Sequence, residues 1–209
     1  MKTNFKSILL IGAGVIFTLL SACHFDHKDS TSIADSANKK QIAATDSANR
    51  ANSTYSDSVN RANTLLKESA SKFLVKSFES GMFEIQMARL VALKGLNADV
   101  KDLELNLLGS YNSITAKITE IATTAGFTLP AAIHADHQKD LNDLDKLAGA
   151  DFDNKYVALV VADHKAAVND YKDAYKNLPE SLTKTFASET LPKIEDLFAL
   201  AKKVKERIK

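Results

Sequence analysis

From residue 65 onward, apolar residues recur at intervals of three or four, which is the spacing of one face of an α-helix. No segment shows the sustained alternation of apolar and polar residues that is typical of a strand. We expect Pro192 to kink the last helix or to split it. The pattern predicts an all-α protein, an up-and-down four-helix bundle with one extra short connecting helix. The expected helices span residues 65–94, 97–125, 134–147, 153–177 and 181–208.

Residues 23–67 are polar and carry an eleven-residue repeat. The sequence Asp-Ser-Ala-Asn at 35–38 and 46–49 becomes Asp-Ser-Val-Asn at 57–60. Eleven residues make three helical turns, so the repeat returns to the same face of a helix. The same Ser, Asn, Asp and Thr content is also typical of a disordered tether, because these residues are poor helix formers. We therefore expect a polar stalk or linker, either helical or disordered, before a bundle domain at 68–209.

The first 22 residues have the features of a secretory signal peptide. Two lysines precede an apolar run from Ile8 to Leu20, which is shorter than a membrane-spanning helix. Leu20-Ser21-Ala22-Cys23 resembles the bacterial lipobox, which implies cleavage before Cys23 and acylation of its thiol. The alternative is an ordinary signal peptide with an incidental cysteine. An Asp after the cysteine retains some lipoproteins in the inner membrane, and His24 in its place favours the outer membrane. We therefore expect an exported lipoprotein, held on a membrane through Cys23 and facing the periplasm or the cell surface.

Composition excludes several classes of function. The chain has 27 basic and 26 acidic side chains, so it lacks the broad positive field of a nucleic-acid-binding protein. A single cysteine excludes an internal disulfide framework and a Cys-rich zinc module. We find no Gly-x-Ser-x-Gly, phosphate-binding loop or dinucleotide fingerprint. The sequence therefore gives no sign of catalysis, while a protein partner or self-association through the stalk is compatible with it.

Two ionisable side chains point into the apolar faces of the expected helices when residues are placed at 100° steps. Glu84 faces inward on the first helix, whereas Glu79 is placed toward the far side. His164 faces inward on the fourth helix, and Tyr111 is the one polar tip expected inside the second. The apolar residues expected beside them are Phe73, Ile85, Met87, Ala88 and Val91 around Glu84, Val157, Val160, Val161, Val168, Tyr171 and Tyr175 around His164, and Leu182, Phe186, Leu197, Leu200, Val204 and Ile208 on the last helix.

A buried carboxylate and a buried imidazole need an explanation, because an unpaired buried charge is costly or shifts its pKa. In a functional interpretation, Glu84 and His164 belong to a metal site between facing helices. In a structural interpretation, they hydrogen-bond to each other or to Tyr111, Ser110 or Tyr171 and align the helices. Metal sites in bundles use three or more ligands, commonly from Glu-x-x-His motifs, and none occurs here. This absence favours the structural interpretation.

His134 and His137 are three residues apart at the start of the short helix, so their imidazoles lie on the same side and could share a metal ion. Two ligands do not define a metal site, and a surface or capping role is favoured for both. His137 nevertheless remains a candidate third ligand beside Glu84 and His164.

Several stretches between residues 70 and 204 together resemble a known family. These are Glu84 with Ala88-Arg89-Leu90 and Lys94, Val100-Lys101-Asp102, Asp136-His137-Gln138, 147–153 with Tyr156, Asp163-His164 and Leu191-Pro192. They are similar to a bacterial family of envelope proteins of unknown function, described as predicted outer-membrane proteins. The resemblance implies a ferritin-like helical bundle.

The family pattern also has an Asp-His pair in the second helix and a histidine after the Leu-Pro of the last helix. In this chain those positions hold Ser110-Tyr111 and Leu197. Of the polar set that a ferritin-like metal centre would use, only Glu84 and His164 remain. This departure lowers the expectation of metal chemistry.

The sequence therefore predicts a lipid-anchored helical bundle of the cell envelope that has a binding or structural role and needs no cofactor. The alternative is a ferritin-like protein that binds iron or another divalent metal, with redox activity, through Glu84, His164 and His137.

Overall fold

The computed structural model describes residues 29–50, 57–179 and 181–208. The expected signal peptide and Cys23 lie outside the described residues. Within those ranges the chain forms helices and no strand, which confirms the all-α prediction. None of the described helices is both long and apolar enough to cross a membrane. The helices are α1 (Ser30–Arg50), α2 (Asp57–Lys94), α3 (Ala98–Ala125), α4 (Ala135–Asp145), α5 (Gly149–Asn177) and α6 (Leu182–Arg207).

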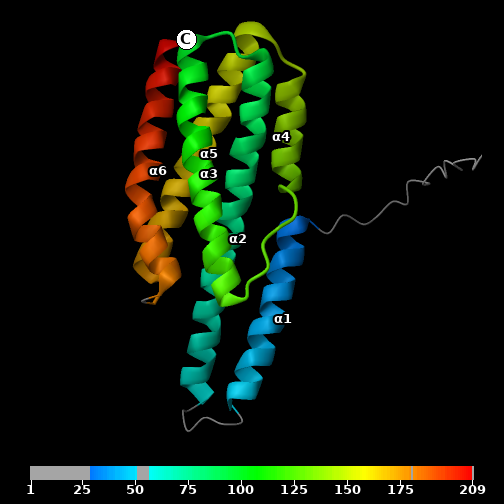
Figure 1. Ribbon diagram of the computed structural model, residues 1–209, viewed down its shortest axis with the longest axis vertical. Coiled ribbons are helices and arrows are strands. Elements are labelled where there is room, and N and C mark those ends of the chain that lie inside the picture. The colour runs from blue at the N-terminus through cyan, green and yellow to red at the C-terminus, as the bar shows by residue number, and fades with distance from the viewer. Residues whose placement is uncertain (1–28, 51–56, 180, 209) are drawn as a thin grey trace, which may run out of the picture.

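Four long helices form a bundle around one hydrophobic core. Helix α2 packs along α3 and α5 along α6, and contacts of α2 with α5 and of α3 with α6 close the bundle. The short helix α4 packs against α2 and α5, at one edge of the bundle (Figure 1). The largest fully buried side chains are Tyr111, Tyr156, Phe83, Phe152, Leu74, Met87, Leu103, Leu107, Ile118, Leu144, Ile194 and His164.

Local sequence explains most of the helix ends. The Asn97 side chain accepts a hydrogen bond from the backbone N–H of Asp99 and caps the start of α3. Gly126 ends α3 with a φ of 71°, a left-handed conformation that glycine adopts without strain. Helix α6 continues through Pro192, so the expectation that this residue could split it is wrong. Pro192 is exposed, and the carbonyl that it leaves without a donor can bind water.

The polar segment before the bundle is helical where the structure describes it. Helix α2 starts at Asp57, eight residues before the predicted start, and α1 packs beside this first part of α2 (Figure 1). The buried residues of α1 are apolar Ala34 and Ile42 and polar Asn38 and Asp46. Buried Asp46 accepts hydrogen bonds from Thr64 and from Lys67 Nζ at 2.6 Å. Buried Asn38 bonds both the N–H and the carbonyl of Thr128, at 2.6 and 3.0 Å.

Two residues expected in the core are exposed. Tyr175 and Leu182 have exposed fractions of 50% and 61%. Tyr175 is in the last turn of α5 and Leu182 begins α6, so both flank the turn at the end of the bundle. Helical periodicity assigns a face to each residue, but it does not show where the neighbouring helices end.

Candidate functional site

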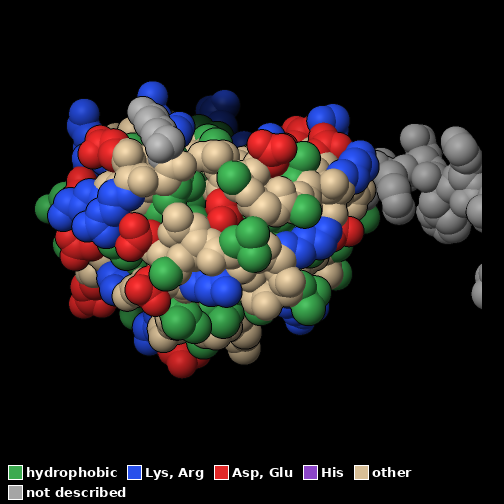
Figure 2. Space-filling model, turned by 90° about the horizontal axis from the view of Figure 1, so that it is seen from above, with side chains coloured by type: hydrophobic (Ala, Val, Ile, Leu, Met, Phe, Trp, Pro, Cys, Tyr) green, Lys and Arg blue, Asp and Glu red, His purple; other side chains and the backbone are tan. Residues whose placement is uncertain are grey.

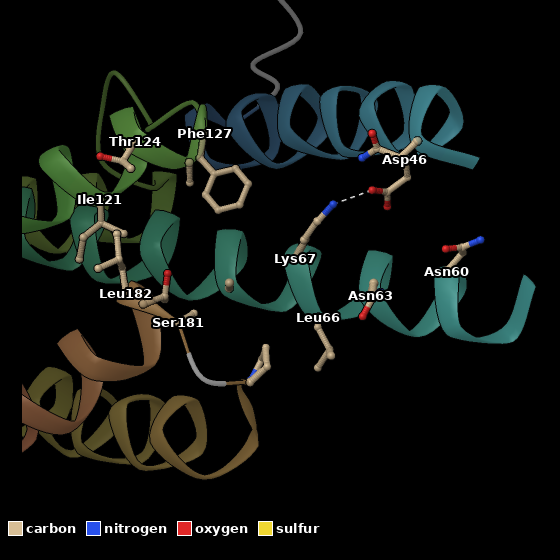
Figure 3. Close-up of a pocket in the computed structure, with 15 residues that line it drawn as sticks. Asp46, Asn60, Asn63, Leu66, Lys67, Ile121, Thr124, Phe127, Ser181 and Leu182 are labelled. Carbon is tan, nitrogen blue, oxygen red and sulfur yellow. Dashed lines mark hydrogen bonds and ion pairs between the residues drawn. The ribbon is translucent and has the colours of Figure 1, made fainter. Parts of the chain in front are cut away.

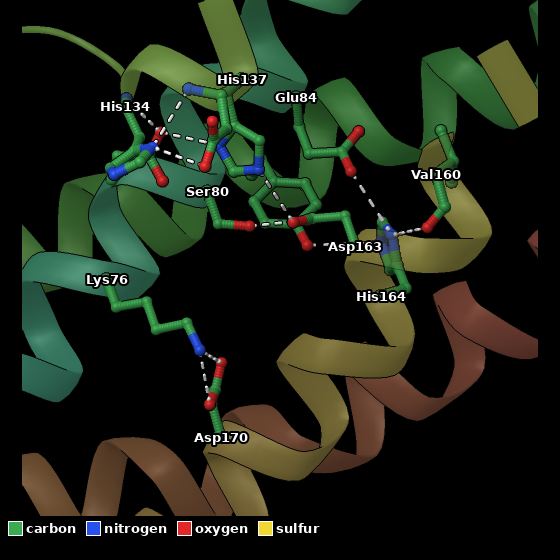
Figure 4. Close-up of polar contacts among 12 residues, drawn as sticks. Lys76, Ser80, Glu84, His134, His137, Val160, Asp163, His164 and Asp170 are labelled. Carbon is green, nitrogen blue, oxygen red and sulfur yellow. Dashed lines mark hydrogen bonds and ion pairs between the residues drawn. The ribbon is translucent and has the colours of Figure 1, made fainter. Parts of the chain in front are cut away.

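Three ligand-type side chains meet inside the bundle: Glu84 from α2, and Asp163 and His164 from α5. One potential ligand atom from each lies within 4.8 Å of the others. Glu84 and His164 are fully buried, so the predicted inward placement of both is confirmed. Asp163, the residue before His164 on α5, lies at the edge of this pair (Figure 4). We call these three residues the inner cluster.

The hydrogen bonds of His164 fix its tautomer. Its Nδ1 lies 2.9 Å from the carbonyl oxygen of Val160, one turn earlier in α5, and 3.4 Å from Glu84 Oε1. Burial lowers the pKa of His164, against the opposing effect of the Asp163 charge, so the ring is neutral and carries one N–H. Nδ1–H therefore donates to Val160, and Nε2 accepts from the Tyr111 hydroxyl at 3.3 Å.

Glu84 is the unsatisfied member of the inner cluster. Neither of its carboxyl oxygens accepts a hydrogen bond from a described residue. Burial raises the pKa of Glu84 well above its usual range, and the carboxylates of Asp163 and Glu104 raise it further. The raised pKa favours the protonated form of Glu84, which can donate a hydrogen bond to Asp163. The ligand atoms of these three groups thus lie close enough together to share a proton or a metal cation.

Asp163 connects the inner cluster to the surface. Its Oδ2 accepts a hydrogen bond from Ser80 Oγ at 2.6 Å, and its Oδ1 lies 3.6 Å from His137 Nε2. A cavity of about 160 Å³ opens beside these groups, and Tyr111 also lines it. Lys76 at its rim is paired with Asp170 at 2.7 Å, so the lysine charge is compensated (Figure 4). The cavity reaches Asp163 of the inner cluster, whereas Glu84 and His164 lie behind it, fully buried.

His137 and Glu79 form a second pair at this cavity. His137 Nδ1 lies 2.7 Å from Glu79 Oε1, and its ring stacks on Phe83 with centroids 4.1 Å apart. Burial lowers the pKa of His137, but the hydrogen bond and charge of Glu79 and the charge of Asp163 outweigh it and raise the pKa overall. Glu79 is buried, so its placement on the far side was wrong. That side of α2 is covered by α4, which a single-helix projection does not reveal.

The remaining candidates do not join the inner cluster. His134 caps α4, since its Nδ1 accepts from the backbone N–H of Asp136 at 3.1 Å, and its Nε2 lies 3.1 Å from Asp29 Oδ2. Ser110 is half-buried and donates to the Asn106 carbonyl of its own helix. Tyr171 is buried and packs edge-on against Phe73. Only Tyr111, of the three proposed partners, contacts His164.

Glu104 is a buried carboxyl that the sequence interpretation overlooked. It lies on α3 with an exposed fraction of 4%, and its Oε2 accepts a hydrogen bond from the Tyr156 hydroxyl. Burial raises its pKa to about 7, although the Tyr156 hydrogen bond opposes this shift. The expectation that Tyr111 is the one polar tip inside this helix was therefore wrong. Glu104 is four residues after Val100 and three before Leu107, and this spacing was the available signal.

A separate groove lies where α1 and α2 meet the end of the bundle. It has a volume of about 590 Å³ and is lined by residues that include Leu66, Ile121 and Phe127 (Figure 3). Its charged side chains, Asp46 and Lys67, pair with each other. The end of the molecule in Figure 2 likewise shows acidic and basic side chains interspersed. The groove therefore presents no set of reactive or metal-binding groups comparable to the inner cluster.

Comparison with known proteins places the chain in a family. Residues 55–204 match the model of a domain of unknown function, DUF4142. The structure is similar to the crystal structure of a DUF305 fragment from Deinococcus radiodurans, with a TM-score of 0.59 and 14% sequence identity. That match covers 66% of this chain and 96% of the other and shows a shared fold. No curated protein matches the chain. Because the family model covers most of the sequence, including the inner cluster, the chain belongs to the DUF4142 family of helical proteins of unknown function.

Proposed function

We propose that this protein binds a divalent transition-metal ion in the inner cluster of a ferritin-like, up-and-down four-helix bundle, and that lipidated Cys23 holds it on the cell envelope. The observation that carries the metal-binding proposal is Glu84, a fully buried carboxyl whose two oxygens accept no hydrogen bond from the described residues. Leaving a buried polar group unpaired is costly, so its retention beside two further ligand-type groups calls for an occupant.

The ligand types and their spacing suit such an ion. Carboxylate and imidazole together bind manganese, iron and zinc. Two ligands bonded to one ion at about 2.1 Å lie roughly 3.0–3.4 Å apart, and His164 Nδ1 is 3.4 Å from Glu84 Oε1. The ion would replace the proton of Glu84.

His164 can present Nδ1 to an ion if its N–H moves to Nε2 and its hydrogen bond to the Val160 carbonyl is broken. The Tyr111 hydroxyl, 3.3 Å from Nε2, can accept that hydrogen bond as well as donate one. Tyr111 therefore supports either tautomer, and it would orient the imidazole as an outer-shell partner does in known metal sites.

Metal titration of the full-length, chelator-treated protein tests the proposal. Mn²⁺, Zn²⁺ and, without oxygen, Fe²⁺ are added, and binding is followed by calorimetry and elemental analysis. We expect Glu84→Gln to weaken binding by about 100-fold, at the upper end of the losses seen for outer-shell partners, because it removes a direct ligand. The matched control is Glu104→Gln, another buried glutamate, which removes a neighbouring charge but no ligand and should change the affinity far less than Glu84→Gln. Equal affinities for Glu84→Gln and the unmodified protein would refute the metal site.

The envelope part of the proposal has a separate test. The motivating feature is the sequence Leu20-Ser21-Ala22-Cys23 after a short apolar run. Cells grown with a labelled fatty acid should label the protein and recover it with membranes, whereas Cys23→Ser should abolish the label. A protein that carries no label and fractionates away from membranes would contradict the anchor while leaving the metal site untouched.

A further inference from the structure

His137 and Asp163 face each other at the mouth of the 160 Å³ cavity, within ion-pair distance but beyond hydrogen-bonding distance. The distance between His137 Nε2 and Asp163 Oδ1 is 3.6 Å. This exceeds the usual limit for a hydrogen bond between nitrogen and oxygen. It is close to the separation of two ligands that share one metal ion, about 3.4 Å in a tetrahedral site.

The surroundings of His137 direct Nε2 toward Asp163. Nδ1 is engaged by Glu79 Oε1 at 2.7 Å, and the same Glu79 oxygen accepts the backbone N–H of His134 at 2.7 Å. The ring also stacks on Phe83 with an interplanar angle of 3°. A carboxylate on one ring nitrogen, which leaves the other free, is the usual arrangement around a metal-binding histidine.

Asp163 is held in a matching way. Ser80 occupies Oδ2 at 2.6 Å and leaves Oδ1 directed at the cavity mouth. Lys76, the basic residue that lines this cavity, is paired with Asp170 and does not neutralise Asp163. The cavity has room for the water ligands that a site with few protein ligands needs.

We propose a second divalent-cation site at this mouth, formed by His137 Nε2 and Asp163 Oδ1, with waters completing the coordination and Glu79 as the positioning residue. It deepens the proposed function, because Asp163 belongs both to this outer site and to the inner cluster. The outer site faces solvent, so an ion reaches it first, and the shared carboxylate leads from there to Glu84 and His164.

Counting bound ions tests the outer site. The chelator-treated full-length protein is dialysed against Zn²⁺, and against Co²⁺ so that absorption bands report the ligands. We expect two ions per chain in the unmodified protein and one in His137→Ala. His134→Asn is the matched control, because asparagine preserves the cap of α4 while removing the neighbouring imidazole, and it should still bind two.

A second variant separates loss of the site from loss of folding. Glu79→Gln keeps the shape of the positioning residue but removes its charge. It should weaken the outer ion by about 10- to 100-fold and leave the inner ion and the circular dichroism spectrum unchanged.

The outcomes distinguish the two proposals. One ion that Glu84→Gln abolishes and His137→Ala does not affect would overturn the outer site alone. One ion that His137→Ala abolishes and Glu84→Gln does not affect would support the outer site and refute the inner one. A single ion lost in both variants would overturn the idea of two sites, and His137→Ala retaining two ions would exclude His137 as a ligand.

Discussion

Glu84 and Glu104 are two buried glutamates of the same bundle with different surroundings. Glu104, on α3, accepts a hydrogen bond from Tyr156 through one of its oxygens. Glu84, on α2, accepts a hydrogen bond from a described residue at neither oxygen, and it lies beside Asp163 and His164. Burial raises the pKa of both. Burial alone therefore does not indicate a functional carboxyl. A buried carboxyl that accepts no hydrogen bond and lies next to further ligand-type groups does.

Of the predicted changes in unfolding free energy, the largest is the loss that Glu104 causes as the pH rises. Its pKa is about 7 in the folded protein against an ordinary value of 4.5. In this interval the folded chain keeps a proton that the unfolded chain has lost. The contribution to stability is therefore complete below pH 4.5 and is lost as the pH rises through 7, by about 3 kcal/mol.

Urea unfolding of the unmodified protein and of Glu104→Gln across this pH range measures that contribution. The unfolding free energy of the unmodified protein should fall relative to that of Glu104→Gln as the pH rises through 7. Parallel curves would mean that the pKa of Glu104 is not raised in the folded protein. Glu104 and Glu84 would then no longer share a raised pKa.

A smaller effect is expected for Tyr156→Phe, which removes the donor to Glu104. A buried acceptor left without its partner costs about 2 kcal/mol in unfolding free energy. Tyr111→Phe is the matched control, because it deletes the same hydroxyl from an equally buried ring, and its 3.3 Å bond to His164 is longer. Chemical denaturation should rank Tyr156→Phe as the more destabilising change, and the reverse order would contradict the assignment of Glu104 as the structural glutamate.

The smallest effect is expected for Glu84→Gln in metal-free protein below pH 4.5, where the carboxyl is protonated in both the folded and the unfolded chain. The carboxyl is already uncharged in the folded state, no donor is lost, and the new amide can donate to Asp163. The unfolding free energy should therefore change by no more than about 1 kcal/mol. A loss of several kcal/mol in the presence of a chelator would show that Glu84 has a structural role.

The fold was largely predictable because helical periodicity and chain breakers are local signals. Gly126 and Asn97 mark helix ends in both sequence and structure. The start of α2 at Asp57 was missed because the polar residues before Leu65 have little apolar periodicity, and packing against α1 stabilises them as a helix. Pro192 was misjudged because its position on the exposed side of α6 depends on how that helix packs.

The candidate site was predictable only in part. Glu84 and His164 follow from the face of a single helix, so the sequence reveals them. Asp163 and Glu79 lie beside the core-facing sides of their helices, not at the centre of those sides. Only the positions of the neighbouring helices bring Asp163 to Glu84 and Glu79 to His137. Contacts between helices join residues far apart in the sequence, so a local sequence pattern does not predict them.

The docking of α1 determines where the chain enters the domain. Ser30 Oγ accepts hydrogen bonds from the backbone N–H groups of Ala131 and Ala132, and Asp29 lies against His134. The N-terminal end of α1 is therefore fastened beside α4, midway along the molecule (Figure 1). If the N-terminal segment holds the protein on a surface, the attachment point is on the flank of the molecule that carries the cavity mouth. The orientation of His137 toward or away from that surface would then depend on the length of the chain between the surface and α1.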